Sequence, residues 1–218
     1  MDNKKKAIFA ITSVLLIVAF IVAKFAFKEH RKDQLSFMAL ENVEIFVRDH
    51  SPKLGPDDAK VYLVEFLDPE CESCKAFYPS VKQLLKLYPG KIKLVVRYVP
   101  LHRNSKHAIK VLEASRKQGK FWKTIETMFQ TQSVWADHHN PQPEKLYDYL
   151  PAAGLDVKKL KEDMKDPAIM DVILQDQADA ATLQVRATPS FFVNGKALES
   201  FGYEQLKALV ESEINKHY

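Results

Sequence analysis

The sequence is poor in glycine, has no repeat and carries no strong excess of either charge. Six glycines and eleven prolines among 218 residues, without a repeating period or a low-complexity tract, argue against collagen-like, solenoid or linker-rich architectures. The 32 basic residues nearly balance the 28 acidic ones, and this net charge of +4 does not indicate a nucleic-acid partner. With 46% hydrophobic residues, the chain can form one sizeable core or a core with an inserted subdomain.

Cysteine is scarce as well, and both copies, Cys71 and Cys74, lie in FLDPECESCKAFYP, residues 66–79. Two cysteines three positions apart in the first turn of a helix share one face, within the distance that a disulfide can bridge. A disulfide that closes a loop of only four residues stabilises the folded protein by only about 2 kcal/mol through the lost entropy of the unfolded chain, so a purely structural disulfide is a poor use of the pair. The spacing therefore predicts reversible thiol–disulfide chemistry. We expect Cys71 to attack, because free N–H groups and the helix dipole stabilise its thiolate, and Cys74 to resolve the mixed disulfide.

Acidic residues surround this pair. Glu72 and Ser73 separate the two cysteines, and Asp68 and Glu70 precede them. Negative charges raise the pKa of a nearby thiol and oppose the effect of the helix dipole. A less stabilised thiolate means a relatively more stable disulfide. We therefore expect a pair less oxidising than one with neutral or basic neighbours, suited to reductase or isomerase work.

Glu65 is a carboxyl group inside VYLVEFL, residues 61–67, an apolar run typical of a strand buried on both faces. Burial without a partner is costly for a carboxylate and raises its pKa. Glu65 is therefore a candidate catalytic residue that accepts the proton of Cys74 through water. The alternative is a carboxyl group that turns into solvent at the edge of a sheet.

Residues 1–28 differ from the rest of the chain. MDNKKK is followed by Ala7 to Ala23, seventeen residues without a charge, close to the lower limit for a helix that spans a bilayer. The charged and bulky flank beyond them is unlike a signal-peptide cleavage site, so we expect an uncleaved membrane anchor; a cleaved signal peptide and a buried soluble helix are the alternatives. The numbers of basic residues before and after this apolar segment are nearly equal, so they do not decide its orientation in the membrane. The short N-terminal tail favours an orientation with the C-terminal part on the exported side.

Residues 29–52 are expected to form a juxtamembrane helix and a linker. The helix predicted at 33–50 has apolar residues around much of its circumference and therefore needs a partner. That partner is either its own domain or a second copy of the chain, which would give self-association near the membrane. A loop at 51–60 then leads into a domain at 53–218.

The order of elements in this domain predicts an α/β fold. Strand, helix and strand form a βαβ unit with a parallel sheet, and a helical insertion at about 104–182 separates it from a hairpin and a last helix. Asn194-Gly195 is a strong signal for the turn of that hairpin. The expected elements are a strand at 61–67, a helix from Cys71 kinked at Pro79, a strand at 91–101, helices at 105–118, 121–130, 143–153, 157–165 and 167–182, a hairpin within 188–198 and a helix at about 203–215.

Three stretches resemble the thioredoxin superfamily, and within it the DsbA-like branch of exported thiol–disulfide oxidoreductases. They are VEFLDPECESCKAFYP, the helical insertion after PLHRNSKHA, and VRATPSFFVNGK. The resemblance covers about residues 53–216 and implies a thioredoxin fold with an inserted helical subdomain. It also implies a cis-proline, Pro189, whose loop lies against the redox pair, so that Thr188 and Pro189 bind the extended peptide of the substrate. With a threonine before this proline, the loop resembles that of the isomerase-like members more than that of the strongest oxidants.

The resemblance further implies partners and a location. Substrates would be cysteine-containing exported proteins, and electrons would pass to or from another redox protein embedded in the same membrane. Disulfide exchange of this kind belongs outside the reducing cytosol, so we expect the catalytic domain on the periplasmic or other extracytoplasmic side of the membrane. No cofactor is expected.

A metal-binding module on the same fold is the main alternative. Cys71 and Cys74 would supply two thiolates, and because thiolates suit Cu(I), copper binding or delivery would be its form. A structural zinc site needs four ligands. His138 and His139 form the only histidine cluster, and no second Cys-x-x-Cys or His-x-x-x-His completes a site. No metal site is therefore predicted.

Overall fold

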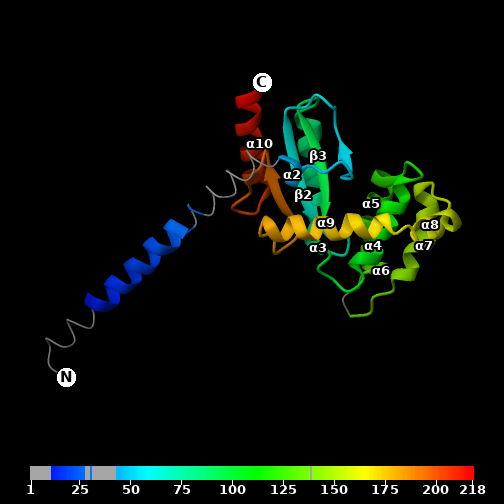
Figure 1. Ribbon diagram of the computed structural model, residues 1–218, viewed down its shortest axis with the longest axis horizontal. Coiled ribbons are helices and arrows are strands. Elements are labelled where there is room, and N and C mark those ends of the chain that lie inside the picture. Colours follow the sequence, from blue (N-terminus) through cyan, green and yellow to red (C-terminus); the bar gives the residue numbers. More distant parts are fainter. Residues whose placement is uncertain (1–10, 28–29, 31–42, 138) are drawn as a thin grey trace.

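A computed structural model describes residues 11–27, 30, 43–137 and 139–218, and it contains one five-stranded sheet in the order β1-β3-β2-β4-β5 (Figure 1). The strands are β1 (Lys53–Leu54), β2 (Val61–Leu67), β3 (Ile92–Tyr98), β4 (Ser190–Val193) and β5 (Lys196–Ala197). The helices of the domain are α2 (Val43–Phe46), α3 (Glu72–Leu87), α4 (Ser105–Arg116), α5 (Phe121–Gln130), α6 (Gln132–Trp135), α7 (Leu146–Tyr149), α8 (Val157–Asp163), α9 (Ala168–Thr182) and α10 (Tyr203–His217), with the 3-10 helices η1 (Pro143–Lys145) and η2 (Leu150–Ala153).

β2 and β3 form the parallel centre of the sheet, in register from Val61 opposite Ile92 to Leu67 opposite Tyr98. Both strands are buried along almost their whole length, as near-continuous apolar runs predict. α3 connects them, and β4 pairs antiparallel with β2 on the other side. The turn between β4 and β5 has positive φ at both Asn194 and Gly195. The predicted βαβ unit and hairpin are therefore confirmed.

Two details differ from the sequence prediction. The sequence predicts a loop at 51–60, but Lys53 and Leu54 form β1, antiparallel to β3. This prediction is wrong because two residues are too few to show an alternating pattern. The single helix predicted at 143–153 is instead α7 between two 3-10 helices, each of which has a proline at its start. Proline lacks the N–H that a continuous helix needs inside its hydrogen-bonded turns.

The two faces of the sheet pack into separate hydrophobic clusters. On one face, Leu63 and Leu67 pack with α3, α10 and the helical insertion. On the other face, Val64 and Phe66 pack with the C-terminal end of α9, yellow in Figure 1, and with Phe46 of α2. Phe46 is 3% exposed, and its ring centroid lies 5.2 Å from that of Phe192. The segment that precedes β1 therefore covers part of the sheet.

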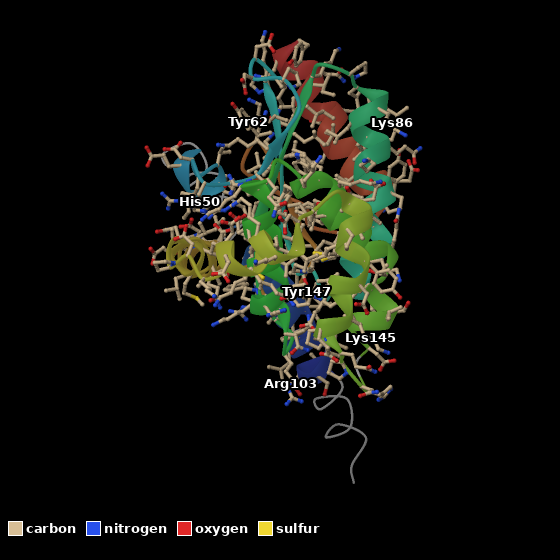
Figure 2. The ribbon with its side chains drawn as sticks, turned by 90° about the vertical axis from the view of Figure 1, so that its right-hand side faces the viewer. His50, Tyr62, Lys86, Arg103, Lys145 and Tyr147 are labelled. Carbon is tan, nitrogen blue, oxygen red and sulfur yellow. The ribbon has the colours of Figure 1, made fainter. Side chains whose placement is uncertain are left out.

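A buried charge cluster holds the same segment in place. Arg97 of β3 is fully buried and donates to Asp176 at 2.8 Å, to Asp179 at 2.5 Å and to the carbonyl of Ile45 at 2.6 Å. Arg48 binds the second oxygen of Asp179 at 2.8 Å. His50, labelled in Figure 2, lies with its Nε2 2.7 Å from Asp176 Oδ1. Paired in this way, the charges can be buried between β3 and α9.

Residues 11–27 form a separate helix, blue in Figure 1, whose apolar side chains are exposed; Leu16 and Phe20, for example, are 71% and 72% exposed. Among the residues that the structure describes, none of the helices combines the length and the hydropathy that a membrane crossing requires. Of the helix predicted at 33–50, residues 43–46 are helical, and residues 33–42 lie outside the described ranges. The predicted anchor and self-association therefore stay predictions.

Truncating Phe46 tests whether α2 is part of the domain. We expect Phe46→Ala to lower the free energy of unfolding by about 3–5 kcal/mol, because a buried ring is removed from the sheet face. Leu174→Ala is the control, since Leu174 is 54% exposed and its truncation should change stability by less than about 0.5 kcal/mol. Urea denaturation of both variants measures the difference. Equal stability of the two would show that Phe46 does not support the fold.

Candidate active site

The two cysteines lie at the start of α3, where β2 ends. Cys71 is the N-cap residue, with extended backbone (φ −72°, ψ 119°), and its N–H donates to the carbonyl of Asp68 at 3.0 Å. Cys74 lies one turn deeper and is fully buried, whereas Cys71 is 7% exposed. Both are free thiols. Of the two sulfurs, that of Cys71 is the one that a partner can reach.

The loop before β4 contacts the first cysteine. Thr188-Pro189 is a cis peptide bond, as the resemblance implies. The sulfur of Cys71 lies 3.2 Å from the carbonyl oxygen of Thr188, although 117 positions separate the two residues. Since β4 is the antiparallel neighbour of β2, the sheet itself brings this loop to the start of α3. The structure therefore places Cys71, Cys74, Thr188 and Pro189 together.

Hydrogen bonds lower the pKa of the Cys71 thiol to about 5. The Cys74 side chain makes the largest contribution, burial acts against it, and the Thr188 side chain and the backbone N–H groups of Cys74 and Ser73 add to the lowering. For Cys74 the direction is opposite: burial, its hydrogen bond to Cys71 and the charges of Glu65 and Cys71 raise its pKa far above the ordinary value. At neutral pH, Cys71 is therefore a thiolate nucleophile and Cys74 a thiol.

The pKa of Cys71 is lowered, although the sequence predicts that the acidic residues around the pair raise it. Asp68 and Glu70 are buried, and both carboxylates accept hydrogen bonds from residues 101–105. Glu72 is exposed to solvent, which screens its charge. None of the three carboxylates is among the principal influences on this pKa. The prediction is wrong because the sequence does not show which partners the carboxylates find.

Glu65 is buried in the centre of the sheet and is 1% exposed. The solvent-facing alternative is therefore wrong: β2 lies between β3 and β4, and Glu65 is paired with Val96 on one side and Phe191 on the other. One carboxyl oxygen has no hydrogen-bond partner within the described residues. Burial, and to a lesser degree the charge of Cys71, raises the pKa of Glu65 to about 8, as the sequence predicts.

Sequence reasoning missed two residues that contact α3 or the turn before it. The side-chain amide of Gln132, in α6, donates to the carbonyl groups of Pro69 at 2.9 Å and Cys71 at 3.1 Å, and so supports the turn before α3. Phe201 is 56% exposed, and its ring centroid lies 4.7 Å from that of Phe77 on α3. Neither residue belongs to a motif, and only the folded chain brings Gln132 to Cys71 and Phe201 to Phe77.

The described residues contain no group of three or more histidine, cysteine, aspartate or glutamate side chains that could hold a metal ion. His102 instead lies with its Nδ1 2.8 Å from Asp68, and His107 lies with its Nε2 3.0 Å from the hydroxyl of Tyr147. His138 lies outside the described residues. The copper alternative therefore gains no third ligand from this part of the chain.

Comparison with known proteins gives a consistent result. A family model described as thioredoxin matches residues 48–212. A thioredoxin-like oxidoreductase from Silicibacter pomeroyi is 27% identical with a TM-score of 0.69, over 80% of this chain and 98% of that one. Oxidised BdbD from Bacillus subtilis has the same identity, 27%, and the same TM-score, 0.69, over 78% of this chain and 95% of that one. A ScsC variant from Proteus mirabilis, 17% identical with a TM-score of 0.75 over 99% and 98% of the two chains, shares the fold.

Curated relatives are longer proteins. The Na(+)/H(+) antiporter NhaA of Herminiimonas arsenicoxydans is 33% identical over 159 residues, which are 72% of this chain and 25% of the antiporter. The antiporter NhaA 3 of Salinispora tropica is 34% identical over 76% of this chain and 24% of its own length. The chain thus spans about a quarter of these relatives, and the similarity concerns one segment of each.

Replacing Cys74 tests the source of the low pKa of Cys71. We expect Cys74→Ala to raise this pKa by about one unit or more, because the strongest hydrogen bond to the thiolate is lost. Cys74→Ser keeps a donor and should raise it less. The ultraviolet absorbance of the thiolate, followed against pH, measures both values. Equal pKa values in the two variants would contradict this assignment.

Replacing Glu65 tests whether its carboxyl group is buried without a partner. Its folded-state pKa of about 8 exceeds the ordinary value of 4.5, so the folded protein binds the extra proton and Glu65 costs stability increasingly as the pH rises between these values. The unfolding free energy of Glu65→Gln, relative to the parent in the oxidised state, should therefore increase by about 1 kcal/mol per pH unit across this window. Urea denaturation at several pH values measures this slope. A slope no larger than that of Glu72→Gln, at an exposed position, would refute the raised pKa.

Proposed function

Because this chain belongs to the thioredoxin family, we propose that it is a protein thiol–disulfide oxidoreductase that exchanges disulfides with the cysteines of exported proteins. The observation that carries this proposal is the pairing of one reachable thiolate, Cys71, with one buried thiol, Cys74, in the first turn of α3. Cys71 is the attacking residue and Cys74 the resolving residue. The 27% identity to a thioredoxin-like oxidoreductase over 80% of the chain supports the same chemistry.

Two thiol exchanges make up the reaction. The thiolate of Cys71 attacks one sulfur of a substrate disulfide, forms a mixed disulfide and releases a substrate thiolate. Cys74 then loses its proton and attacks the sulfur of Cys71, so that the second substrate thiolate leaves and the enzyme pair is oxidised. In the opposite direction a substrate thiolate attacks Cys71 in the enzyme disulfide, and Cys74 leaves and takes up a proton. A second substrate thiolate then attacks the substrate sulfur of the mixed disulfide, the substrate disulfide forms, and Cys71 leaves as a thiolate. Two electrons move with each complete exchange.

Glu65 is the group we assign to the proton of Cys74. Its charge contributes to the raised pKa of Cys74, so the two groups interact electrostatically. With a pKa of about 8, the carboxyl group is mostly protonated at neutral pH and close to its midpoint. It can therefore give a proton to Cys74 when this sulfur leaves, and take one when it attacks, through water in either case.

Disulfide donation is the direction that the pKa of Cys71 favours. A stabilised thiolate makes the reduced pair more stable, and this makes the disulfide a stronger oxidant. The preference for reductase or isomerase work depended on carboxylates raising this pKa, but the hydrogen bonds to Cys71 lower it to about 5. We therefore assign the chain to oxidation of substrate thiols.

Substrate docking involves the surface around Cys71. Thr188 and Pro189 would bind the extended backbone of the substrate beside the sulfur, consistent with the 3.2 Å contact of Thr188. The exposed ring of Phe201, packed on Phe77, adds an apolar contact surface. Unfolded proteins expose apolar side chains, so this surface suits a cysteine in an unfolded segment.

The location and the partner are part of the same proposal. Residues 7–23 would anchor the chain in a membrane, with the catalytic domain on the exported side. The exposed apolar side chains of the helix at 11–27 support a lipid contact. A redox protein in the same membrane would restore the enzyme disulfide, because each donation leaves the pair reduced.

Trapping of mixed disulfides tests the proposed function. We expect Cys74→Ser, produced in cells that export it, to accumulate covalent adducts with exported proteins, since the resolving thiol is missing. Non-reducing electrophoresis and mass spectrometry should locate the bond at Cys71. Cys71→Ser is the matched control and should give no adducts, because Cys74 is fully buried. Adducts through Cys74, or none in either variant, would contradict the roles assigned here.

A further inference from the structure

The loop after β3 carries a titratable group close to the redox pair. His102 lies in this loop, and its side chain is 30% exposed. Nδ1 lies 2.8 Å from Asp68 Oδ2, and since a carboxylate only accepts hydrogen bonds, Nδ1 carries a proton. The proton that this histidine gains or loses is therefore the one on Nε2.

Asp68 joins His102 to Cys71. Its carbonyl oxygen accepts the N–H of Cys71 at 3.0 Å, while its carboxylate accepts the N–H of Leu101 at 2.8 Å, the N–H of His102 at 3.2 Å and the hydroxyl of Ser105 at 2.7 Å. Asp68 itself is fully buried. The turn that carries Cys71 and the loop that carries His102 are thus held by one residue, through its backbone carbonyl and its side chain, which fixes the separation of the two groups.

The groups that face His102 are mostly negative. Burial alone lowers the pKa of its imidazole, but the hydrogen bond and charge of Asp68, and the charges of Cys71 and Glu70, raise it above the ordinary value. Arg103, exposed and labelled in Figure 2, is the neighbouring cation. Among these groups, Cys71 is the one whose charge changes with the redox state.

We propose that His102 is a positioning residue that couples the uptake of a proton to the reduction of the Cys71–Cys74 disulfide. This inference rests on the proposed function, in which Cys71 is the reacting thiol. Reduction by the two thiols of a substrate delivers two electrons and leaves a thiolate at Cys71 and, with one proton, a thiol at Cys74. The new negative charge draws a further proton from solvent to Nε2 of His102. Reoxidation removes this charge, and His102 releases the proton.

The coupling acts equally on both partners. If the thiolate of Cys71 favours the imidazolium of His102, the imidazolium favours the thiolate to the same extent. The effect on Cys71 is smaller than that of its hydrogen bonds to Cys74 and Thr188, which dominate its pKa. The disulfide should therefore become a stronger oxidant when the pH falls through the titration of His102, in addition to the change that the cysteines themselves produce.

Nuclear magnetic resonance titration of the histidines tests this coupling. We expect the pKa of His102 to be higher in the reduced than in the oxidised protein by about half a unit, which is roughly a threefold change in the proton affinity. His139, exposed in the loop after α6, is the internal control, and its signal should be the same in both states. An unchanged pKa of His102 between the two states would overturn the inference.

Variants at position 102 test the reciprocal effect. His102→Gln keeps a hydrogen-bond donor for Asp68 but has no charge, and should raise the pKa of Cys71 by about half a unit; His102→Lys restores a cation and should return it toward the parent value. His139→Gln is the matched control and should leave it unchanged. A folded His102→Gln protein with the parent pKa of Cys71, or a Lys variant that equals the Gln variant, would overturn the inference. If Cys71 were unreactive in the parent protein, the proposed function would fail instead.

Discussion

A negative charge on the sulfur of Cys71 is the feature on which the site depends, and the fold supplies what stabilises it. α3 begins at this residue, so backbone N–H groups of Ser73 and Cys74 reach the thiolate. The parallel pairing of β2 with β3 and the antiparallel pairing of β2 with β4 bring Thr188, whose side-chain hydrogen bond lowers the pKa of Cys71, to the same point. Cys74, one turn deeper, adds its hydrogen bond while its own proton is retained by burial. Local helix geometry and long-range sheet topology therefore act on one atom.

The charged groups inside the domain follow two different rules. Arg97 with Asp176 and Asp179, and Asp68 with residues 101–105, are buried with partners for their polar atoms, and they join segments distant in sequence. Glu65 is buried with one carboxyl oxygen that has no hydrogen-bond partner among the described residues, and burial raises its pKa into the range where it can exchange a proton at neutral pH. The partnered charges serve the fold, and Glu65 is placed where thiol chemistry needs a proton.

Much of this arrangement can be predicted from the sequence, and the failures share one cause. The buried strand at Val61–Leu67, the helix after Cys71 and the Asn194-Gly195 turn are local patterns, and each is found where the sequence predicts it. The partners of Asp68 and Glu70 come from residues 101–105, and no local pattern shows these contacts or the long-range hydrogen bond of Thr188 that helps to lower the pKa of Cys71. Gln132 is missed for the same reason, since its role exists only after the chain has folded. The packing of Phe46 on its own domain is one of the two alternatives that the sequence leaves open for the helix at 33–50.

The reduction potential of the Cys71–Cys74 disulfide, obtained by equilibration with glutathione at neutral pH, tests the central claim most directly. A thiolate as stable as the contacts of Cys71 indicate should place the potential above about −200 mV, toward the disulfide-donating end of the family. A value near about −270 mV, as in reducing thioredoxins, would contradict the account, because it would mean that the start of α3 does not hold this charge.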